Sequence, residues 1–508
     1  MLSALIWIPI LSAALVGFWP GGLSSKLARQ LTLAVAIGLF VWSLVLLLQF
    51  NPSQVSMQFQ EYLPWIEQIG LTYSLGVDGL SMPLLVLNGL LTVIALYSTD
   101  EKIPRSRFYY ALILLLNASV AGAFLAQDLL LFFIFYELEL IPLYFLIAIW
   151  GGSRRGYAAT KFLLYTAASG VLILAAFLGL AFLDGISNFA YQETVQLASL
   201  LPLAEQLLLL GAIVIGFGIK IPLVPFHTWL PDAHVEASTP ISILLAGVLL
   251  KLGTYGLLRF GLGLFPEAWA VLAPWLAIWA VVSVLYGALN ALAQRDMKKM
   301  VAYSSVAHMG YILLAAAAAT PLSLVAAVVQ MVGHGLIAAL LFFLVGVVYK
   351  KTGSRDLKVL NGLLNRERGL PLIGSLMVVG VMASAGIPGM IGFISEFLVF
   401  RGSFEVFPTQ TLLCMLGTGL TAVYLLILLD RAFFGRLSTA VINLPPVKWG
   451  ERIPAIVLAI LIVVLGVQPG WLTRLSEVTT AAMVTTPQTV ALQNSDGITL
   501  KSALNKPL

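Results

Sequence analysis

The sequence predicts an all-α protein that crosses a membrane about fourteen times. Hydrophobic residues make up 60% of the 508 positions and charged residues only 10%, against roughly 45–50% and 25% in soluble domains. The apolar runs are about 17–25 residues long, the length that a helix needs to cross a hydrocarbon layer of roughly 30 Å. Lys and Arg are also concentrated in alternate loops, which is typical of a polytopic membrane protein.

The first run begins almost at Met1, with no basic region before it and no small-residue cleavage site directly after it. We therefore expect it to be a retained span and not a signal peptide. In order, the predicted spans cover residues 2–19, 31–50, 80–98, 108–126, 129–150, 162–183, 205–224, 240–260, 267–292, 301–316, 322–347, 372–398, 409–430 and 453–470.

The basic residues predict an orientation. Of 28 Lys and Arg, 21 lie at the loops after spans one, three, five, nine, eleven and thirteen, and only Arg259 and Arg401 lie at the other loops between spans. Loops rich in Lys and Arg stay on the cytoplasmic side, so both termini are expected on the non-cytoplasmic, or lumenal, side. This bias accounts for the net charge of +5, and a nucleic-acid partner is not predicted.

The order of the spans predicts four sections. Residues 1–107 hold three N-terminal spans, 108–260 and 261–435 hold two five-span repeats of inverted topology, and 436–508 hold the last span and a polar tail. The repeat rests on element order, because the side chains of the two halves do not align. The tail from 471 onward is expected to be held loosely.

Several kinds of site have no motif in this chain. No loop is long enough for a soluble domain, and no GxxxxGK or GxGxxG loop is present for a nucleotide. The single Cys414 leaves no internal disulfide and no cysteine-ligated cluster. We therefore expect no cofactor in this chain, and any redox cofactors in partner subunits.

Prolines interrupt two of the spans. Pro222 and Pro225 lie in the seventh span and Pro388 in the twelfth, and a proline inside a helix leaves a carbonyl without its N–H partner. Such breaks at corresponding places in two halves mark many transport sites, although an ordinary kink is the simpler explanation for either one alone. Both breaks lie beside a charged residue in an apolar segment, which favours a functional role.

Five charged residues lie deep in apolar runs. Each ionised group at the hydrocarbon centre costs roughly 2.5–3.5 kcal/mol on insertion scales, so a chain that keeps several of them is expected to use them. Desolvation favours the neutral form of a buried Lys or Glu and an opposite charge favours the ionised form, so a Glu–Lys pair can act as a proton switch. A static ion pair is the alternative. The five are Glu137, Glu139, Lys220, Lys251 and Glu396.

Glu137 and Glu139 are about 200° apart around a helix, so they cannot both face one partner. We expect Glu137 to be the interior group, with Glu139 as a second relay member or facing a neighbouring subunit.

The four histidines gather between residues 227 and 334. Histidine suits a proton carrier, because its ordinary pKa is near neutrality. A buried imidazole that only satisfies its hydrogen bonds is the alternative for each, and a haem held by His308 and His334 is not favoured. His308 and His334 are therefore relay candidates, and His227 and His234 are secondary ones.

Several segments resemble one family, the antiporter-like membrane subunits of respiratory complex I, and within it the M-type or D-type chain. They include GVDGLSMPL at 76–84, LLLFFIFYELELIPLYFLIAIWGG, IKIPLVPFHTWLPDAHVEASTPISILLAG, MKKMVAYSSVAHMGY, HGLIAALLFFLVG and ASAGIPGMIGFISEFLVF. The resemblance covers about residues 75–435.

The resemblance implies a role for each charged group. Glu137 and Lys220 match a coupling ion pair, Lys251 the central lysine, His308 and His334 bridging histidines, and Glu396 the exit group. Glu139 departs from the bacterial respiratory pattern, and together with Glu137 it is similar to plastid and cyanobacterial chains.

The resemblance also implies a setting. It points to a D-type subunit of the photosynthetic NDH-1 complex in a thylakoid or bacterial inner membrane, beside B-type and F-type antiporter-like chains. That complex is an NAD(P)H or ferredoxin:plastoquinone oxidoreductase, whose partner subunits hold plastoquinone, the iron–sulfur clusters and the electron donor. A variant tied to carbon dioxide uptake remains open. Two other hypotheses are also open. The chain could be a subunit of an Mrp-type cation/proton antiporter, or a membrane scaffold with inert ion pairs.

Overall fold

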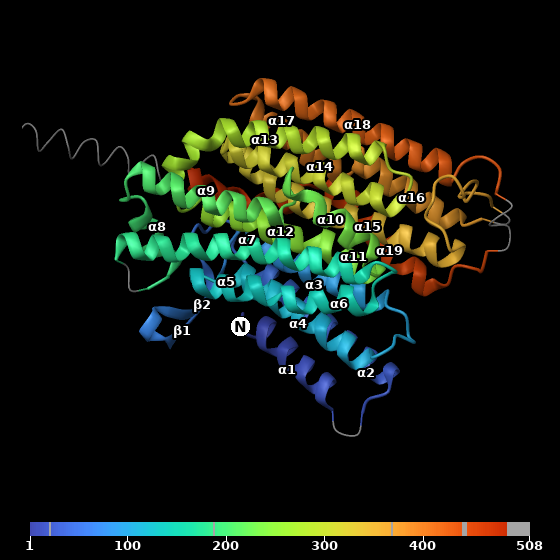
Figure 1. Cartoon of the computed structure of the whole chain (residues 1–508), viewed down its shortest axis with the longest axis horizontal. Coiled ribbons are helices and arrows are strands. Elements are labelled where there is room, and N and C mark those ends of the chain that lie inside the picture. The colour runs from blue at the N-terminus through green and yellow to red at the C-terminus, as the bar shows by residue number, and fades with distance from the viewer. Residues whose placement is uncertain (20–21, 186–187, 367–368, 439–443, 485–508) are drawn as a thin grey trace, which may run out of the picture.

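Helices fill most of the chain, as the sequence predicts. A computed structural model describes all residues except 20–21, 186–187, 367–368, 439–443 and 485–508. Most of the long helices run along the longest dimension of the molecule, with α1 at one edge and α18 at the other (Figure 1). The elements are α1 (Ala4–Phe18), α2 (Ser25–Gln49), β1 (Gln58–Ile66), η1 (Glu67–Ile69), β2 (Leu71–Val77), α3 (Met82–Tyr97), α4 (Ser106–Leu125), α5 (Leu129–Leu138), α6 (Leu140–Trp150), α7 (Arg155–Asp184), α8 (Tyr191–Ala198), α9 (Leu203–Lys220), η2 (Phe226–Thr228), α10 (Trp229–Glu236), α11 (Thr239–Leu244), η3 (Leu245–Leu249), α12 (Leu250–Gly256), η4 (Leu257–Leu262), α13 (Pro266–Leu292), α14 (Met297–Ala318), α15 (Pro321–Thr352), α16 (Pro371–Ser384), α17 (Ile391–Phe404), α18 (Pro408–Ala432) and α19 (Trp449–Val467).

These elements account for the fourteen predicted spans. Within the described ranges, 11 helices are long and apolar enough to cross a membrane, and α1, α3 and α16 are shorter apolar helices. The fifth span is α5 with α6, the eighth runs from α11 to η4, and the twelfth combines α16 and α17. Proline in the first turn marks where α3, α11, α13, α15, α16 and α18 begin, a position that needs no N–H donor.

Hydrogen bonds between loops divide the loops into two sets. On the first face, which we call the basic face, the loops after spans one, three, five, nine and eleven contact one another. These bonds are Ser25 Oγ to the Glu101 carbonyl at 2.8 Å, Trp150 Nε1 to the Pro104 carbonyl at 2.7 Å, and Met297 N to the Arg355 carbonyl at 3.0 Å.

The second face, which we call the hairpin face, carries the other loops. Its bonds are Thr72 N to Asp128 Oδ2 at 3.0 Å, Leu129 N to the Phe189 carbonyl at 2.9 Å, and Thr320 Oγ1 to the Gly402 carbonyl at 2.9 Å. A missed or extra span would have joined loops of opposite sets. The division therefore agrees with the predicted number and order of spans.

A β-hairpin lies where the sequence analysis placed only a loop, at residues 51–79. Strands β1 and β2 pair antiparallel around Gly70, which has the left-handed φ of 70° that glycine adopts readily. The apolar residues of β1 do not alternate with polar ones, and Pro64 interrupts the strand. Because of these features, the strand cannot be predicted from hydrophobic periodicity. The hairpin lies at one end of the helices, beside α5 (Figure 1).

Spans eight, ten and eleven form the centre of the molecule. The most apolar window of span eight, within Thr239–Leu262, is 100% buried, and those of α14 and α15 are 94% buried, compared with 28% for α2. Charged and polar side chains on the central helices therefore contact protein and not lipid.

The seventh and twelfth spans are broken at the predicted places. Helix α9 ends at Lys220 and α10 begins at Trp229, while α16 ends at Ser384 and α17 begins at Ile391. Side chains satisfy part of the exposed backbone in the first break. Trp229 Nε1 donates to the Ile219 carbonyl at 2.9 Å, and Val224 N donates to Ser283 Oγ at 3.2 Å. Irregular backbone at membrane depth is tolerated where protein supplies such partners.

The expectation of a loosely held tail after the last span is wrong for its first part. Residues 470–484 are helical, and Ser476 and Thr480 on this segment are fully buried. Thr479 accepts a hydrogen bond from the backbone of Gly79 at 3.1 Å. The Thr and Ser residues that suggested a polar tail instead bond to backbone groups within the fold. Residues 485–508 lie outside the described ranges.

Candidate functional site

The first buried ion pair joins Lys220 to Glu139. Lys220 is the last residue of α9, and Glu139 lies between α5 and α6. Their side chains are 1% and 0% exposed, and Lys220 Nζ contacts Glu139 Oε1. The ammonium also lies 5.0 Å from the centroid of the Tyr136 ring, a favourable position for a cation.

This pairing corrects the expectation that Glu137 forms the ion pair with Lys220. Glu137 is only half-buried, and its Oε1 atom has no hydrogen-bond partner within the described ranges. The carboxylate lies against Gly170 of α7, where a Cβ atom would come within 1.9 Å of it. Glu137 is near enough to Lys220 to interact with it electrostatically. Lys220 therefore interacts with two glutamates. Glu139 contacts it directly, and Glu137 interacts with it electrostatically at longer range.

The sequence could not decide between the two glutamates. Their spacing shows only that they point to different sides of the helix. Which of these sides faces α9 depends on how the helices pack.

The second buried lysine lies in an irregular helix. Lys251 is in α12, which is flanked by the π-helical segments η3 and η4, and π-helical turns are frequent at functional sites. Lys251 is 0% exposed. Its Nζ atom donates to the Ala246 carbonyl at 2.6 Å and lies 2.7 Å from Nδ1 of His334 in α15.

Gly335 allows this close contact between α15 and the Lys251 span, and Gly247 allows the same span to lie against Leu91 of α3. A Cβ atom on Gly335, next to His334, would lie 2.8 Å from the Gly247 carbonyl, and one on Gly247 would lie 2.2 Å from Leu91. Real Cβ atoms do not approach so closely. A larger residue at position 335 would push α15 away from the Lys251 span and lengthen the contact between Lys251 and His334.

Two further groups, His308 and Glu396, continue from His334. The His334 ring centroid lies 5.5 Å from that of His308 in α14, and His308 Nε2 lies 3.5 Å from Glu396 Oε1 in α17. A small cavity of about 10 Å³, lined by both histidines and Glu396, joins them. That volume is about enough for one water molecule.

Hydrogen bonds fix the proton positions on both rings. His308 Nδ1 lies 2.7 Å from the Ser304 carbonyl, which can only accept, so Nδ1 carries a proton and Nε2 faces Glu396. His334 Nδ1 faces the Lys251 ammonium, a donor, so Nδ1 accepts and Nε2 carries the proton in the neutral ring. His308 therefore exchanges protons only at Nε2, whereas His334 can accept a proton on Nδ1 and release one from Nε2.

Two residues of neighbouring helices surround Glu396. Thr418 Oγ1 donates to Glu396 Oε2 at 2.8 Å, and the hydroxyls of Tyr311 and Thr418 are 3.1 Å apart. The Glu396 carboxylate is 4% exposed. Thr418 and Tyr311 are functional neighbours that were not predicted from the sequence. Only the position of Tyr311, three residues after His308, could have indicated that it shares a helix face with that residue.

The structure does not bring His227 and His234 into this series. The His227 ring packs against Tyr286, with centroids 5.0 Å apart, and the His234 ring stacks on Phe342 at 4.3 Å. Neither ring nitrogen of His234 has a hydrogen-bond partner within the described ranges.

The two lysines belong to spans that pack closely. Gly253, two residues after Lys251, lies against α9, where a Cβ atom would be 3.2 Å from Lys220 Cβ. The Lys220 side chain points to Glu139 and the Lys251 side chain points to His334. The site thus consists of the Lys220–Glu139 pair and a series of four groups, which are Lys251, His334, His308 and Glu396.

In the part of the chain that the structure describes, no three His, Cys, Asp or Glu side chains are grouped to hold a metal ion.

Comparison with known proteins agrees with this architecture. Residues 126–421 match the family model described as NADH:quinone oxidoreductase/Mrp antiporter, TM. The NAD(P)H-quinone oxidoreductase chain 4 1 of Synechococcus sp. (strain JA-3-3Ab) is 43% identical over 95% of this chain and 92% of its own.

Solved structures show the same fold. A chain of respiratory complex I from Thermus thermophilus with bound NADH has a TM-score of 0.86 and 27% identity, covering 96% of this chain and 99% of that one. A chain of the Mrp complex from Dietzia sp. DQ12-45-1b has a TM-score of 0.84 at 21% identity, over 96% and 98%. The protein belongs to the NADH:quinone oxidoreductase/Mrp antiporter family, as a proton-translocating membrane subunit of the chain 4 type of NAD(P)H-quinone oxidoreductase.

Proposed function

We propose that protons move through this subunit along Lys251, His334, His308 and Glu396, driven by changes at the Lys220–Glu139 pair. The observation that carries the proposal is the continuous series of contacts from Lys251 to Glu396 across α12, α15, α14 and α17. Each member can gain and lose a proton, and each is less than 6% exposed.

The first transfer follows from the Lys251 contact. When Lys251 gives a proton to Nδ1 of His334, the ring becomes a cation that can release the other proton from Nε2. That proton passes through the shared cavity to Nε2 of His308, which faces Glu396. His334 accepts on Nδ1 and releases from Nε2, and His308 accepts and releases at Nε2. Before the next transfer, His334 must return to the tautomer that carries its proton on Nε2.

The coupling step involves Lys220. While Glu139 contacts Lys220, the negative carboxylate offsets the ammonium charge. Separation of the two would leave a positive charge on α9 close to the Lys251 span, and like charges in a low-dielectric interior repel strongly. A proton on Lys251 would then move away from Lys220, toward His334. Electron transfer in other subunits would supply the energy for the separation.

The setting extends the same proposal. The basic face would lie on the cytoplasmic or stromal side, which places both termini and the hairpin face toward the lumen, in a thylakoid or bacterial inner membrane. B-type and F-type antiporter-like chains would be the neighbours, and plastoquinone, iron–sulfur clusters and the electron donor would be bound by other subunits. A complex tied to carbon dioxide uptake would use the same route.

Replacement of Glu396 by Gln tests the proposal, because it removes the exit group and keeps the Thr418 hydrogen bond. In proteoliposomes that contain the assembled complex, we expect proton translocation per electron to fall while the contacts around α17 are kept. Undiminished translocation would contradict the route.

The fold shared with the Mrp complex supports a second candidate, cation/proton antiport through the same groups. Sodium would then enter in exchange for protons. A proton flux that depends on sodium, without quinone reduction by the purified assembly, would favour this candidate over the first.

A further inference from the structure

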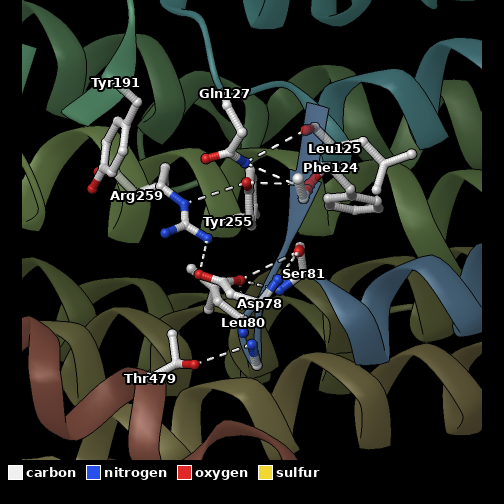
Figure 2. Close-up of polar contacts among 12 residues, drawn as sticks. Asp78, Leu80, Ser81, Phe124, Leu125, Gln127, Tyr191, Tyr255, Arg259 and Thr479 are labelled. Atoms are coloured by element: carbon white, nitrogen blue, oxygen red, sulfur yellow. Dashed lines mark hydrogen bonds and ion pairs between the residues drawn. The ribbon is translucent and has the colours of Figure 1, made fainter. Parts of the chain in front are cut away.

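A second buried ion pair lies on the hairpin face of the Lys251 span. Asp78 is in the loop between β2 and α3, and Arg259 is in η4. Arg259 Nη2 lies 2.5 Å from Asp78 Oδ2, and the side chains are 6% and 2% exposed. Figure 2 shows the guanidinium between the two tyrosines above it and the Asp78 loop below. From the sequence, Arg259 was expected only to lie at a loop between spans.

Both oxygens of the Asp78 carboxylate accept hydrogen bonds. Its Oδ1 atom accepts from the backbone N–H groups of Leu80 and Ser81, both at 3.1 Å, and from Ser81 Oγ at 3.3 Å. Its Oδ2 atom accepts from Arg259. Asp78 is thus the buried counter-charge of Arg259, and its removal would leave the guanidinium unpaired.

The guanidinium is also held from the other side. Arg259 Nε donates to the Tyr255 hydroxyl at 3.3 Å, and the group lies 5.4 Å from the ring centroids of both Tyr191 and Tyr255. The Tyr255 hydroxyl donates to the Phe124 carbonyl at 3.3 Å. A dense polar cluster therefore surrounds the ion pair.

The position of this cluster relative to Lys251 is its most informative property. Tyr255 follows Lys251 by four residues and Arg259 follows Tyr255 by four, so the three share one side of the span. Arg259 lies about two helical turns from Lys251, toward the hairpin face. A proton leaving Lys251 along this side would have to pass Tyr255 and then the ion pair.

We propose that the Asp78–Arg259 pair is a proton barrier that closes the hairpin-face end of the Lys251 span. The proposal rests on the proposed role of Lys251 as a proton carrier. Arginine stays protonated in proteins and so cannot relay a proton. With this end closed, the proton on Lys251 is directed sideways to His334.

The helical segment at residues 470–484 packs against the Asp78 loop and holds it in place. Gly79, next to Asp78, donates its N–H to Thr479 Oγ1 at 3.1 Å. A Cβ atom on Gly79 would lie 2.1 Å from the Leu475 carbonyl, so only glycine fits between the Asp78 loop and residues 470–484. This packing holds Asp78 against Arg259.

The test is a double variant, Asp78→Asn with Arg259→Gln, in the assembled complex. Amides keep hydrogen bonds and avoid a lone buried charge. In proteoliposomes without substrate, an imposed pH gradient should decay roughly tenfold faster than with the unaltered complex, which corresponds to about 1.4 kcal/mol of lost barrier. Quinone reduction should be retained, which shows that the complex has assembled. A gradient that decays at the unaltered rate would overturn the proposal.

Two control variants distinguish a specific proton barrier from an ion pair that only stabilises the hairpin face. Asp128→Asn alters another buried carboxylate on the same face, one that caps α5 and contacts Thr72, and it should not increase the leak. Arg259→Lys keeps a positive charge opposite Asp78 but can release its proton, so its leak should lie between those of the unaltered complex and the double variant. A leak of equal size in Asp128→Asn would mean that any disturbance of this face admits protons, which would overturn the proposal.

Adding Lys251→Met to the double variant distinguishes the two proposals. The barrier hypothesis expects the triple variant to be tight again, because the leak starts from Lys251. A leak that persists in the triple variant would contradict Lys251 as the carrier. If Lys251→Met alone abolishes pumping but the double variant does not leak, the barrier fails and the proposed function stands.

Discussion

The ammonium of Lys251 lies 2.7 Å from Nδ1 of His334, at the centre of a fold whose surrounding helices exclude lipid. A lysine and a histidine in such contact cannot both be cations without strong repulsion. They hold one proton more easily than two, so the contact is suited to passing a proton between helices α12 and α15.

Replacing Lys251 by Arg should stop proton pumping although it keeps the positive charge. Arginine does not release its proton in proteins, whereas the proposed route needs Lys251 to do so. The measurement is acidification of proteoliposomes driven by quinone reduction. Pumping at the unaltered rate would show that charge alone is sufficient at this position.

Replacing His334 by Gln should reduce pumping because an amide can hold a hydrogen bond but cannot accept a proton on one atom and release one from another. We expect a loss of at least roughly 10²-fold, the lower limit for removal of a general acid–base group. His227→Gln is the matched control, since His227 packs against Tyr286 outside the series. Equal losses in the two variants would contradict the assignment.

Glu139→Gln should destabilise the assembled complex more than Glu137→Gln. Only the first change leaves the buried Lys220 ammonium without its contact, and breaking such a pair costs roughly 3–5 kcal/mol. Thermal unfolding of the purified complex measures the difference. The double variant Glu139→Gln with Lys220→Met should recover the stability but not the pumping. A larger destabilisation by Glu137→Gln would reverse the assignment of the ion pair.

Gly335→Ala should impair pumping through a single methyl group. Its Cβ would lie 2.8 Å from the Gly247 carbonyl, which forces α15 away from the Lys251 span at a cost of about 1–3 kcal/mol. Gly419→Ala is the control, because a Cβ there meets nothing within 4 Å. Proton translocation per electron should fall in the first variant and stay unchanged in the second.

Much of the fold could be predicted because the physics of membrane crossing acts on every span separately. Apolar length determines the number of spans, and the placement of Lys and Arg determines which loops share a face. Pro222, Pro225 and Pro388 mark the two breaks because proline lacks the N–H that a continuous helix needs. The charged candidates could be found because ionised groups are costly at this depth.

What could not be predicted depends on which side of a helix faces a given neighbour. Spacing shows that Glu137 and Glu139 diverge, but only packing against α9 decides which one contacts Lys220. The Asp78–Arg259 pair joins residues 181 positions apart, and neither residue lies in a periodic pattern that indicates its partner. The helix at 470–484 is polar in composition, and its hydrogen bonds to the Asp78 loop depend on the tertiary fold.

The central claim is that Lys251 carries the translocated proton. The most direct test is the number of protons translocated per electron in proteoliposomes that contain the assembled complex with Lys251→Met, which is close to lysine in length and has no titratable group. The account predicts that this number falls well below that of the unaltered complex, with the subunit composition unchanged. An unchanged number of protons per electron would contradict it.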